Sequence, residues 1–257
     1  MKTSPRIAIV ATPRSGNTWL RHLLSASLGL PDIAVHELTP SVIAGLPDRC
    51  VLQIHWRRDP AFVALLDRLG FRVVTVARHP FDVLLSILQF CRKEPQTRHW
   101  LLGTGGSEAS ILSAGPSDRQ FLDYGTSERA AQLFGVTEDW WPSSGAMQVR
   151  YEELVADPQR ELGRILGELG VEPVRDLAEV IRIKAFSHLK SVTPNGHYWI
   201  GQPGHWRRFL TRTEAEHLAK PRGFSWSELN YSANADENLV PLDAARHWRE
   251  AMAGSAR

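Results

Sequence analysis

The chain has 257 residues, of which 43% are hydrophobic and 23% are charged, and its formal net charge is +2. This composition is typical of a soluble globular chain that can bury a full core. The charge is too balanced to indicate nucleic-acid binding by itself. Because an α/β domain can occupy this length without dividing, we expect one domain over residues 1–257.

The cysteines and histidines show no pattern typical of a disulfide framework or a metal site. Cys50 and Cys91 lie in or beside apolar segments, which predicts reduced core thiols. The histidines lack the spacing of common metal motifs. The apolar run near the N-terminus is shorter than a secretory signal needs, and no stretch is long enough to span a membrane. We therefore expect a cytoplasmic protein without a metal.

The first candidate site is the stretch Ala-Thr-Pro-Arg-Ser-Gly-Asn-Thr-Trp at 11–19. A short apolar run at 7–10 precedes it and leucines at helical spacing follow, which predicts strand, turn and helix. Backbone N–H groups in such a turn can face an anion, the helix dipole adds to the attraction, and Arg14 supplies a full charge. The turn is a candidate phosphate site, although Ser, Gly and Asn also occur in ordinary turns.

Strands and helices then alternate. We predict strands at 50–54 and 71–77, with helices at about 60–69 and from about residue 81. Residues 32–48 are expected to form an irregular connection. The alternation predicts a three-layer α/β/α fold with a central, mainly parallel sheet.

Three polar side chains follow three different predicted strands. Arg14, His55 and Arg78 each lie at or just after a carboxyl end. Ligands of parallel sheets bind beyond these ends, so we expect the three residues to converge on one site.

Glycine, serine and proline are frequent in residues 94–118, which predicts a mobile loop or lid. The wider segment 94–145 is the candidate lid, and it contains one helical stretch from about 121 to 134. The elements expected after it are a strand at 146–151, helices at 158–169 and 174–183, a loop-like segment at 190–211, and a C-terminal extension at 225–257 with a helix near 242–252.

Five segments resemble, in order, motifs of the sulfotransferases that use 3′-phosphoadenosine 5′-phosphosulfate (PAPS). Pro-Arg-Ser-Gly-Asn-Thr-Trp-Leu from residue 13 resembles the 5′-phosphosulfate loop. Ala-Arg-His-Pro-Phe-Asp-Val-Leu-Leu-Ser from residue 77 resembles the 3′-phosphate segment. The others are Val-Arg-Tyr-Glu-Glu-Leu from residue 149, Ala-Phe-Ser-His-Leu-Lys from residue 185 and Gly-His-Trp-Arg-Arg-Phe-Leu-Thr from residue 204. The resemblance implies a P-loop-like α/β fold.

The resemblance also implies how the donor is bound. Arg14 would neutralise the leaving 5′-phosphate oxygen, Arg78 and Ser86 would hold the 3′-phosphate, and Trp19 would stack on adenine. The remaining residues expected around the donor are Ser15, Gly16, Asn17, Thr18, Tyr151, Phe186 and Gly201.

His55 occupies the place of the family's catalytic base, although a lone histidine at a strand end can equally be a scaffold residue. The chain departs from the family pattern nearby, since Gln53 replaces a lysine. Trp199 and Ile200 replace two cations that would grip the 3′-phosphate. Arg207 or Arg208 is a candidate substitute for them.

The resemblance implies transfer of a sulfuryl group from PAPS to a hydroxyl, or less readily an amine, of a small-molecule acceptor, with adenosine 3′,5′-bisphosphate (PAP) as the second product. Nucleic acid is not an expected partner. One alternative is a non-catalytic nucleotide-binding relative. The other alternative is a P-loop nucleotide kinase. Its phosphate-binding loop needs a lysine at the position where this chain has Asn17, which argues against it. Five tryptophans are candidates for the acceptor cleft or for the core, namely Trp56, Trp100, Trp140, Trp141 and Trp199.

Overall fold

The computed structural model describes residues 6–103, 106–192, 198–220, 228–229 and 231–253. The chain forms two compact units, each made of two segments. Met1–Arg78 and Gly135–Leu189 make the first unit, and His79–Phe134 and Lys190–Arg257 make the second. The expected extension at 225–257 belongs to the second unit, and its residues 225–227, 230 and 254–257 lie outside the described part.

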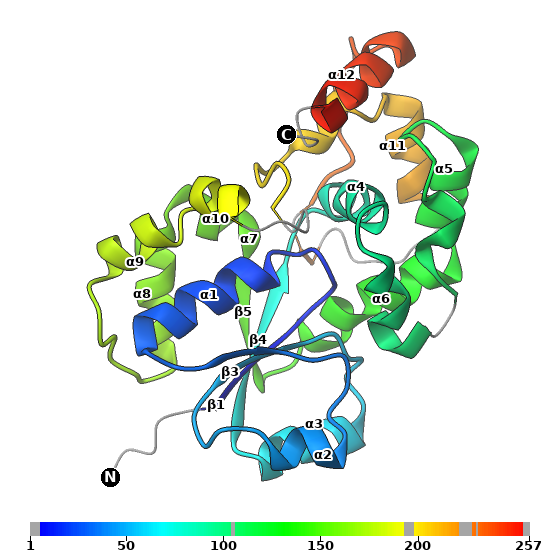
Figure 1. Ribbon diagram of the computed structural model, residues 1–257. Coiled ribbons are helices and arrows are strands. Elements are labelled where there is room, and N and C mark those ends of the chain that lie inside the picture. The colour runs from blue at the N-terminus through cyan, green and yellow to red at the C-terminus, as the bar shows by residue number, and fades with distance from the viewer. Residues whose placement is uncertain (1–5, 104–105, 193–197, 221–227, 230, 254–257) are drawn as a thin grey trace. The chain divides into compact units, whose positions relative to one another are not determined.

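The first unit is built on a parallel sheet in the order β2-β3-β1-β4-β5 (Figure 1). The strand order places β1 between β3 and β4, so the carboxyl ends of three neighbouring strands meet at one edge. The strands are β1 (Arg6–Val10), β2 (Asp32–Ala34), β3 (Val51–Ile54), β4 (Phe71–Ala77) and β5 (Ala146–Arg150).

Helices cover both faces of this sheet. The connection from β1 through α1 to β2 runs in one direction along the sheet, and that from β3 through α3 to β4 runs in the other. Right-handed crossovers therefore place α1 and α3 on opposite faces, as Figure 1 shows. The predicted three-layer α/β/α architecture is confirmed. The helices of this unit are α1 (Asn17–Leu28), α2 (Pro40–Ala44), α3 (Pro60–Arg68), α7 (Tyr151–Ala156), α8 (Pro158–Glu168) and α9 (Leu177–Ile183).

The second unit is organised by α4 (Pro80–Cys91), all of whose residues are buried. The carboxylate of Asp82 accepts hydrogen bonds from the backbone N–H groups of Gly204 (2.7 Å) and Trp206 (2.9 Å). Asp82 thereby ties the 3₁₀ helix η3 (His205–Arg208) to α4. The other elements are η1 (Pro95–Gly103), η2 (Glu108–Ile111), α5 (Arg119–Gly125), α11 (Arg212–Ala219) and α12 (Pro241–Ala253). Two further helices contribute residues to both units, α6 (Glu128–Trp140) and α10 (Phe186–Val192).

Several predicted boundaries are wrong. The segment 32–48 contains β2 and α2, which the pattern hides because β2 has three residues and none is buried. The helical stretch at 121–134 belongs to two helices, α5 and α6. The expected strand at 146–151 ends at Arg150, where α7 begins, and the loop-like segment 190–211 includes η3.

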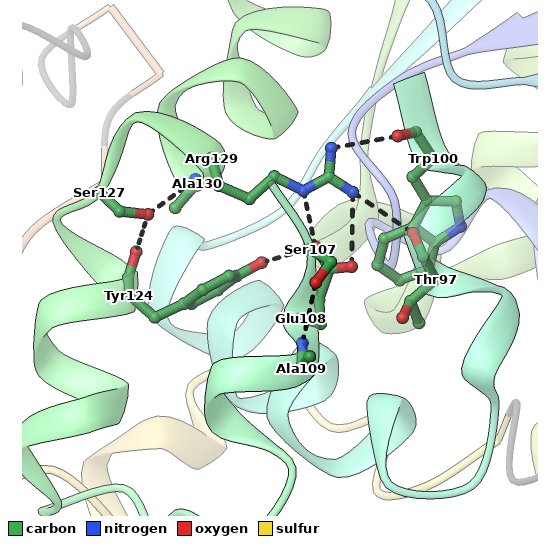
Figure 2. Close-up of polar contacts among 9 residues, drawn as sticks. All are labelled: Thr97, Trp100, Ser107, Glu108, Ala109, Tyr124, Ser127, Arg129 and Ala130. Atoms are coloured by element: carbon green, nitrogen blue, oxygen red, sulfur yellow. Dashed lines mark hydrogen bonds and ion pairs between the residues drawn. The ribbon is translucent and has the colours of Figure 1, made fainter. Parts of the chain in front are cut away.

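A buried ion pair holds much of the segment expected to be a mobile loop (Figure 2). Arg129 and Glu108 are only 3% and 1% exposed, and Arg129 Nε donates to Glu108 Oε1 at 2.8 Å. The Arg129 guanidinium also donates to the carbonyls of Trp100 (3.1 Å) and Thr97 (3.3 Å). Tyr124 donates its hydroxyl to Glu108 at 3.1 Å. Burial raises the pKa of the Tyr124 hydroxyl well above its usual value, so it stays a donor.

None of the helices that the structure describes is long and apolar enough to cross a bilayer.

The Arg129→Met substitution is expected to lower the free energy of unfolding by about 3–5 kcal/mol, because it leaves the Glu108 carboxylate buried without its cation. Denaturant unfolding measures this loss. Arg119→Met is the control, since the ion pair of Arg119 with Asp123 has a 91% exposed arginine side chain. Equal losses in the two variants would show that the buried pair contributes no more than a surface pair.

Candidate functional site

The turn between β1 and α1 has an unusual backbone. Arg14 has φ 69° and Gly16 has φ 104°, both in the left-handed region. α1 begins directly after Gly16, which as glycine has no side chain to cap the helix. The first N–H groups of a helix have no partner within the helix and carry the positive end of its dipole. The turn therefore offers backbone donors to an anion.

Tyr151 explains why residue 16 is glycine. A Cβ atom at position 16 would lie 2.3 Å from Cδ2 of the Tyr151 ring, far inside van der Waals contact. The φ of Gly16, 104°, independently disfavours residues with a side chain. Tyr151 is 2% exposed, so its ring is a rigid support for the turn.

Arg78 brings a cation to the same turn from the end of β4. Its Nη1 donates to the Arg14 carbonyl at 3.2 Å, and its guanidinium carbon lies 4.5 Å from the centroid of the Tyr151 ring. Arg78 Nε has no hydrogen-bond partner among the described residues. A guanidinium has five N–H donors, so most of those of Arg78 are left for a ligand.

His55 enters the site from the end of β3. Its Nδ1 lies 2.7 Å from the carbonyl oxygen of Ala11, at the end of β1. A carbonyl only accepts, so Nδ1 carries the proton and Nε2 is the acceptor nitrogen of the neutral ring. Burial lowers the pKa of His55 to about 4, assisted by the charges of His36, Arg14 and Arg21 and opposed by the bond to Ala11. The imidazole is therefore neutral near pH 7.

Gln53 connects His55 to the first turn of α1. Its Nε2 lies 3.4 Å from His55 Nε2, and its Oε1 accepts from the Thr18 hydroxyl at 3.4 Å. This orientation agrees with the tautomer of His55, because the amide nitrogen faces the accepting ring nitrogen. The residue that replaces the expected lysine is thus a neutral neighbour of the imidazole.

The structure brings Arg14, His55 and Arg78 together at the carboxyl ends of β1, β3 and β4. Ser15 and Asn17 are buried beneath the turn, where the Ser15 N–H and the Asn17 side chain both donate to the carbonyl of Thr12. These contacts place Ser15 and Asn17 at the same turn as Arg14.

Trp19 is 7% exposed and packs in the first unit. Its indole N–H donates to the Lys184 carbonyl at 2.9 Å, and its ring meets the Tyr151 ring edge-on, with centroids 6.3 Å apart. Phe186, half-buried, begins α10. Stacking of adenine on Trp19 stays a prediction.

The second unit holds the other predicted donor residues. Ser86 is buried in α4, and Gly201 has φ 74°. The exposed Arg207 donates to the Asn234 carbonyl at 3.0 Å and lies 4.5 Å over the Trp206 ring, while the Arg208 carbonyl accepts from His247 Nδ1. Their roles toward a donor stay predictions.

Three of the five candidate tryptophans of the acceptor cleft are core residues. Trp100 stacks on Phe90, Trp140 donates to the Trp56 carbonyl, and Trp199 packs on Phe209 and Trp248. Trp56 and Trp141 are half-buried.

Sequence reasoning missed three residues that shape the two units. Asp82 lies inside a quoted motif, so its carboxylate could have been suspected of a structural role. Thr12 and Thr137 form a reciprocal pair, with Thr12 N–H donating to Thr137 Oγ1 at 2.9 Å and Thr137 N–H donating to Thr12 Oγ1 at 3.3 Å. A separation of 125 residues hides this pair from any local pattern.

Gly16→Ala is expected to lower the free energy of unfolding by about 1–3 kcal/mol or more, because alanine is strained at this φ and its Cβ meets Tyr151. Gly163→Ala is the matched control, because Gly163 lies inside α8 with nothing within 4 Å of a Cβ atom. That substitution is expected to be neutral or stabilising. Thermal unfolding that ranks the two variants in the opposite order would contradict this account of the turn.

No group of three or more His, Cys, Asp or Glu side chains suited to a metal ion occurs in the described part of the chain.

Solved structures with a similar fold include a sulfotransferase and a retinol dehydratase. Mouse sulfotransferase SULT7A1, solved in complex with PAP, matches with TM-score 0.64 and 17% identity over 96% of this chain and 89% of that one. Retinol dehydratase, in complex with androsterone and PAP, matches with TM-score 0.58 and 14% identity over 93% and 84% of the two chains. A search of curated protein sequences found no significant match. The family model of the sulfotransferase domain matches residues 4–221. The chain therefore belongs to the sulfotransferase family.

Proposed function

We propose that the protein transfers the sulfuryl group of PAPS to a hydroxyl, or less readily an amine, of a small-molecule acceptor, with His55 as the base. The observation that carries this proposal is the bond from His55 Nδ1 to the Ala11 carbonyl. It fixes the tautomer in which Nε2 can accept a proton, beside a turn suited to a phosphate. Membership of the sulfotransferase family supports the reaction class.

The donor-binding residues fit a bisphosphate nucleotide. The uncapped start of α1 and the Arg14 cation would receive the 5′-phosphate, together with Ser15, Gly16, Asn17 and Thr18. Arg78, with most of its N–H donors unengaged, would receive the 3′-phosphate. The neighbours SULT7A1 and retinol dehydratase were both solved with PAP. Bound PAPS supplies an activated sulfuryl group.

We assign further donor contacts to residues at the other predicted positions. Tyr151 would contribute to donor binding by supporting the β1–α1 turn. Trp19 would contribute by stacking its ring on the adenine of the donor. The remaining assignments, which rest on the resemblance, are Ser86, Phe186, Gly201, Arg207 and Arg208.

His55 would take the proton as the acceptor oxygen bonds to sulfur. The new oxygen–sulfur bond forms while the bond from sulfur to the leaving phosphate oxygen breaks, and the hydroxyl proton goes to Nε2. The Ala11 carbonyl then stabilises the imidazolium through Nδ1–H. Arg14 would stabilise the charge that develops on the leaving oxygen, as expected by analogy with phosphoryl transfer.

The acceptor is proposed to be a small apolar molecule. Retinol dehydratase was solved with androsterone and with retinol, and both ligands carry hydroxyl groups. We assign the segment 94–145 to the acceptor side. We also propose a cytoplasmic location, which the free, buried thiols of Cys50 and Cys91 support.

His55→Gln is expected to lower turnover about 10²- to 10⁴-fold, because the proton loses its acceptor. Labelled PAPS with a panel of phenols, alcohols, sugars and amines measures transfer, and calorimetry with PAP measures donor binding, which is expected to persist. His217→Gln, at an exposed histidine of α11, is the control. If the native protein binds the donor but transfers its sulfuryl group to no acceptor, the result would favour the alternative hypothesis of a non-catalytic nucleotide-binding relative.

We expect the free energy of unfolding to depend on pH because His55 titrates at different pH values in the folded and unfolded protein. Its pKa is about 4 when folded and about 6.5 when unfolded. Between these values the unfolded chain binds the extra proton, so stability falls as the pH is lowered from about 6.5 to about 4. Unfolding at pH 7 and pH 4.5 should differ by about 2–3 kcal/mol more in the native protein than in His55→Gln. Identical differences would show that the imidazole is not buried in neutral form.

A further inference from the structure

The Thr137 side chain bonds to two strand ends at once. Its hydroxyl donates to the Val76 carbonyl at 3.1 Å, near the end of β4, and accepts from the Thr12 N–H at 2.9 Å, just after β1. A carbonyl cannot donate, so the direction of both bonds is fixed. Thr137 N–H also donates to Thr12 Oγ1 at 3.3 Å. Thr12, Val76 and Thr137 are at most 4% exposed.

These bonds continue into the turn. The Thr12 carbonyl accepts from Asn17 Nδ2 at 2.8 Å, at the first residue of α1. A path of buried hydrogen bonds therefore leads from Val76 through Thr137 and Thr12 to the start of α1. Arg78 lies two residues beyond Val76, and its own bond to the Arg14 carbonyl closes the loop at 3.2 Å.

We propose that Thr137 is a positioning residue that sets the spacing between the β1–α1 turn and Arg78. This inference rests on the proposed function, in which the turn and Arg78 receive the two phosphates of one nucleotide. A ligand with two linked anionic groups gains affinity only where both groups reach their sites without strain. A residue that bonds to both strand ends therefore controls affinity for the bisphosphate more than affinity for either monophosphate.

Thr137→Val tests the proposal, because valine keeps the shape and removes the hydroxyl. Calorimetry compares PAP with adenosine 5′-monophosphate and adenosine 3′-monophosphate. We expect Thr137→Val to weaken PAP binding about tenfold and each monophosphate less than about twofold. Thr137→Ser, which retains the hydroxyl, is expected to restore PAP affinity.

Thr126→Val is the matched control, because Thr126 follows the last residue of α5 and its hydroxyl donates to the carbonyls of Leu122 and Asp123 in that helix. It should leave all three affinities unchanged. If Thr137→Val does not fold, Thr12→Val removes the other oxygen of the pair and is expected to give the same selective loss.

Equal weakening of all three nucleotides, or unchanged PAP affinity in a folded variant, would overturn the role of Thr137. Native protein that binds no PAP would instead overturn the proposed function, and the inference with it. The two failures are thus distinguishable by measuring the native protein first.

Discussion

The site depends on where the carbonyl oxygens of one turn point. Between β1 and α1, the carbonyls of Ala11, Thr12 and Arg14 accept from His55, Asn17 and Arg78 respectively. Each donor side chain comes from a different part of the first unit. Two left-handed residues, Arg14 and Gly16, give the backbone this path. The N–H groups of Thr12 and Ser15 are bonded within the protein, so it is the first N–H groups of α1 that can serve an anion.

The same turn sets the electrostatics of the imidazole. Burial is the first cause of the low pKa of His55, and the nearby Arg14 lowers it further. An anion held by Arg14 would oppose that effect, because negative charge favours the protonated ring. The imidazole would thus become a stronger base when the donor is in place, which suits the proposed role of His55 as the proton acceptor.

The sequence predicts those parts of the fold that follow from short-range patterns. The β-branched run of β4 was expected at 71–77, and α3 begins after Asp59, whose carboxylate accepts from the Phe62 N–H at 2.8 Å. Convergence of Arg14, His55 and Arg78 followed from strand alternation alone. The pair Thr12–Thr137 and the support of Gly16 by Tyr151 link residues far apart in the chain, so no periodicity could reveal them. The buried Arg129–Glu108 ion pair could not be predicted from the sequence either. The polar composition of residues 94–118 does not indicate that backbone carbonyls of this segment accept hydrogen bonds from a buried arginine.

The aromatic cluster of the second unit limits how the protein could be redesigned. Trp199 stands where the family pattern has an arginine, and it is 8% exposed between Phe209 and Trp248. An arginine at position 199 would bury a charge against the rings that hold α12, so this substitution would come with partial release of that helix. Ile200 is half-buried, and a lysine there could extend its ammonium to water. A positive charge is therefore compatible with the packing at position 200 and not with that at position 199.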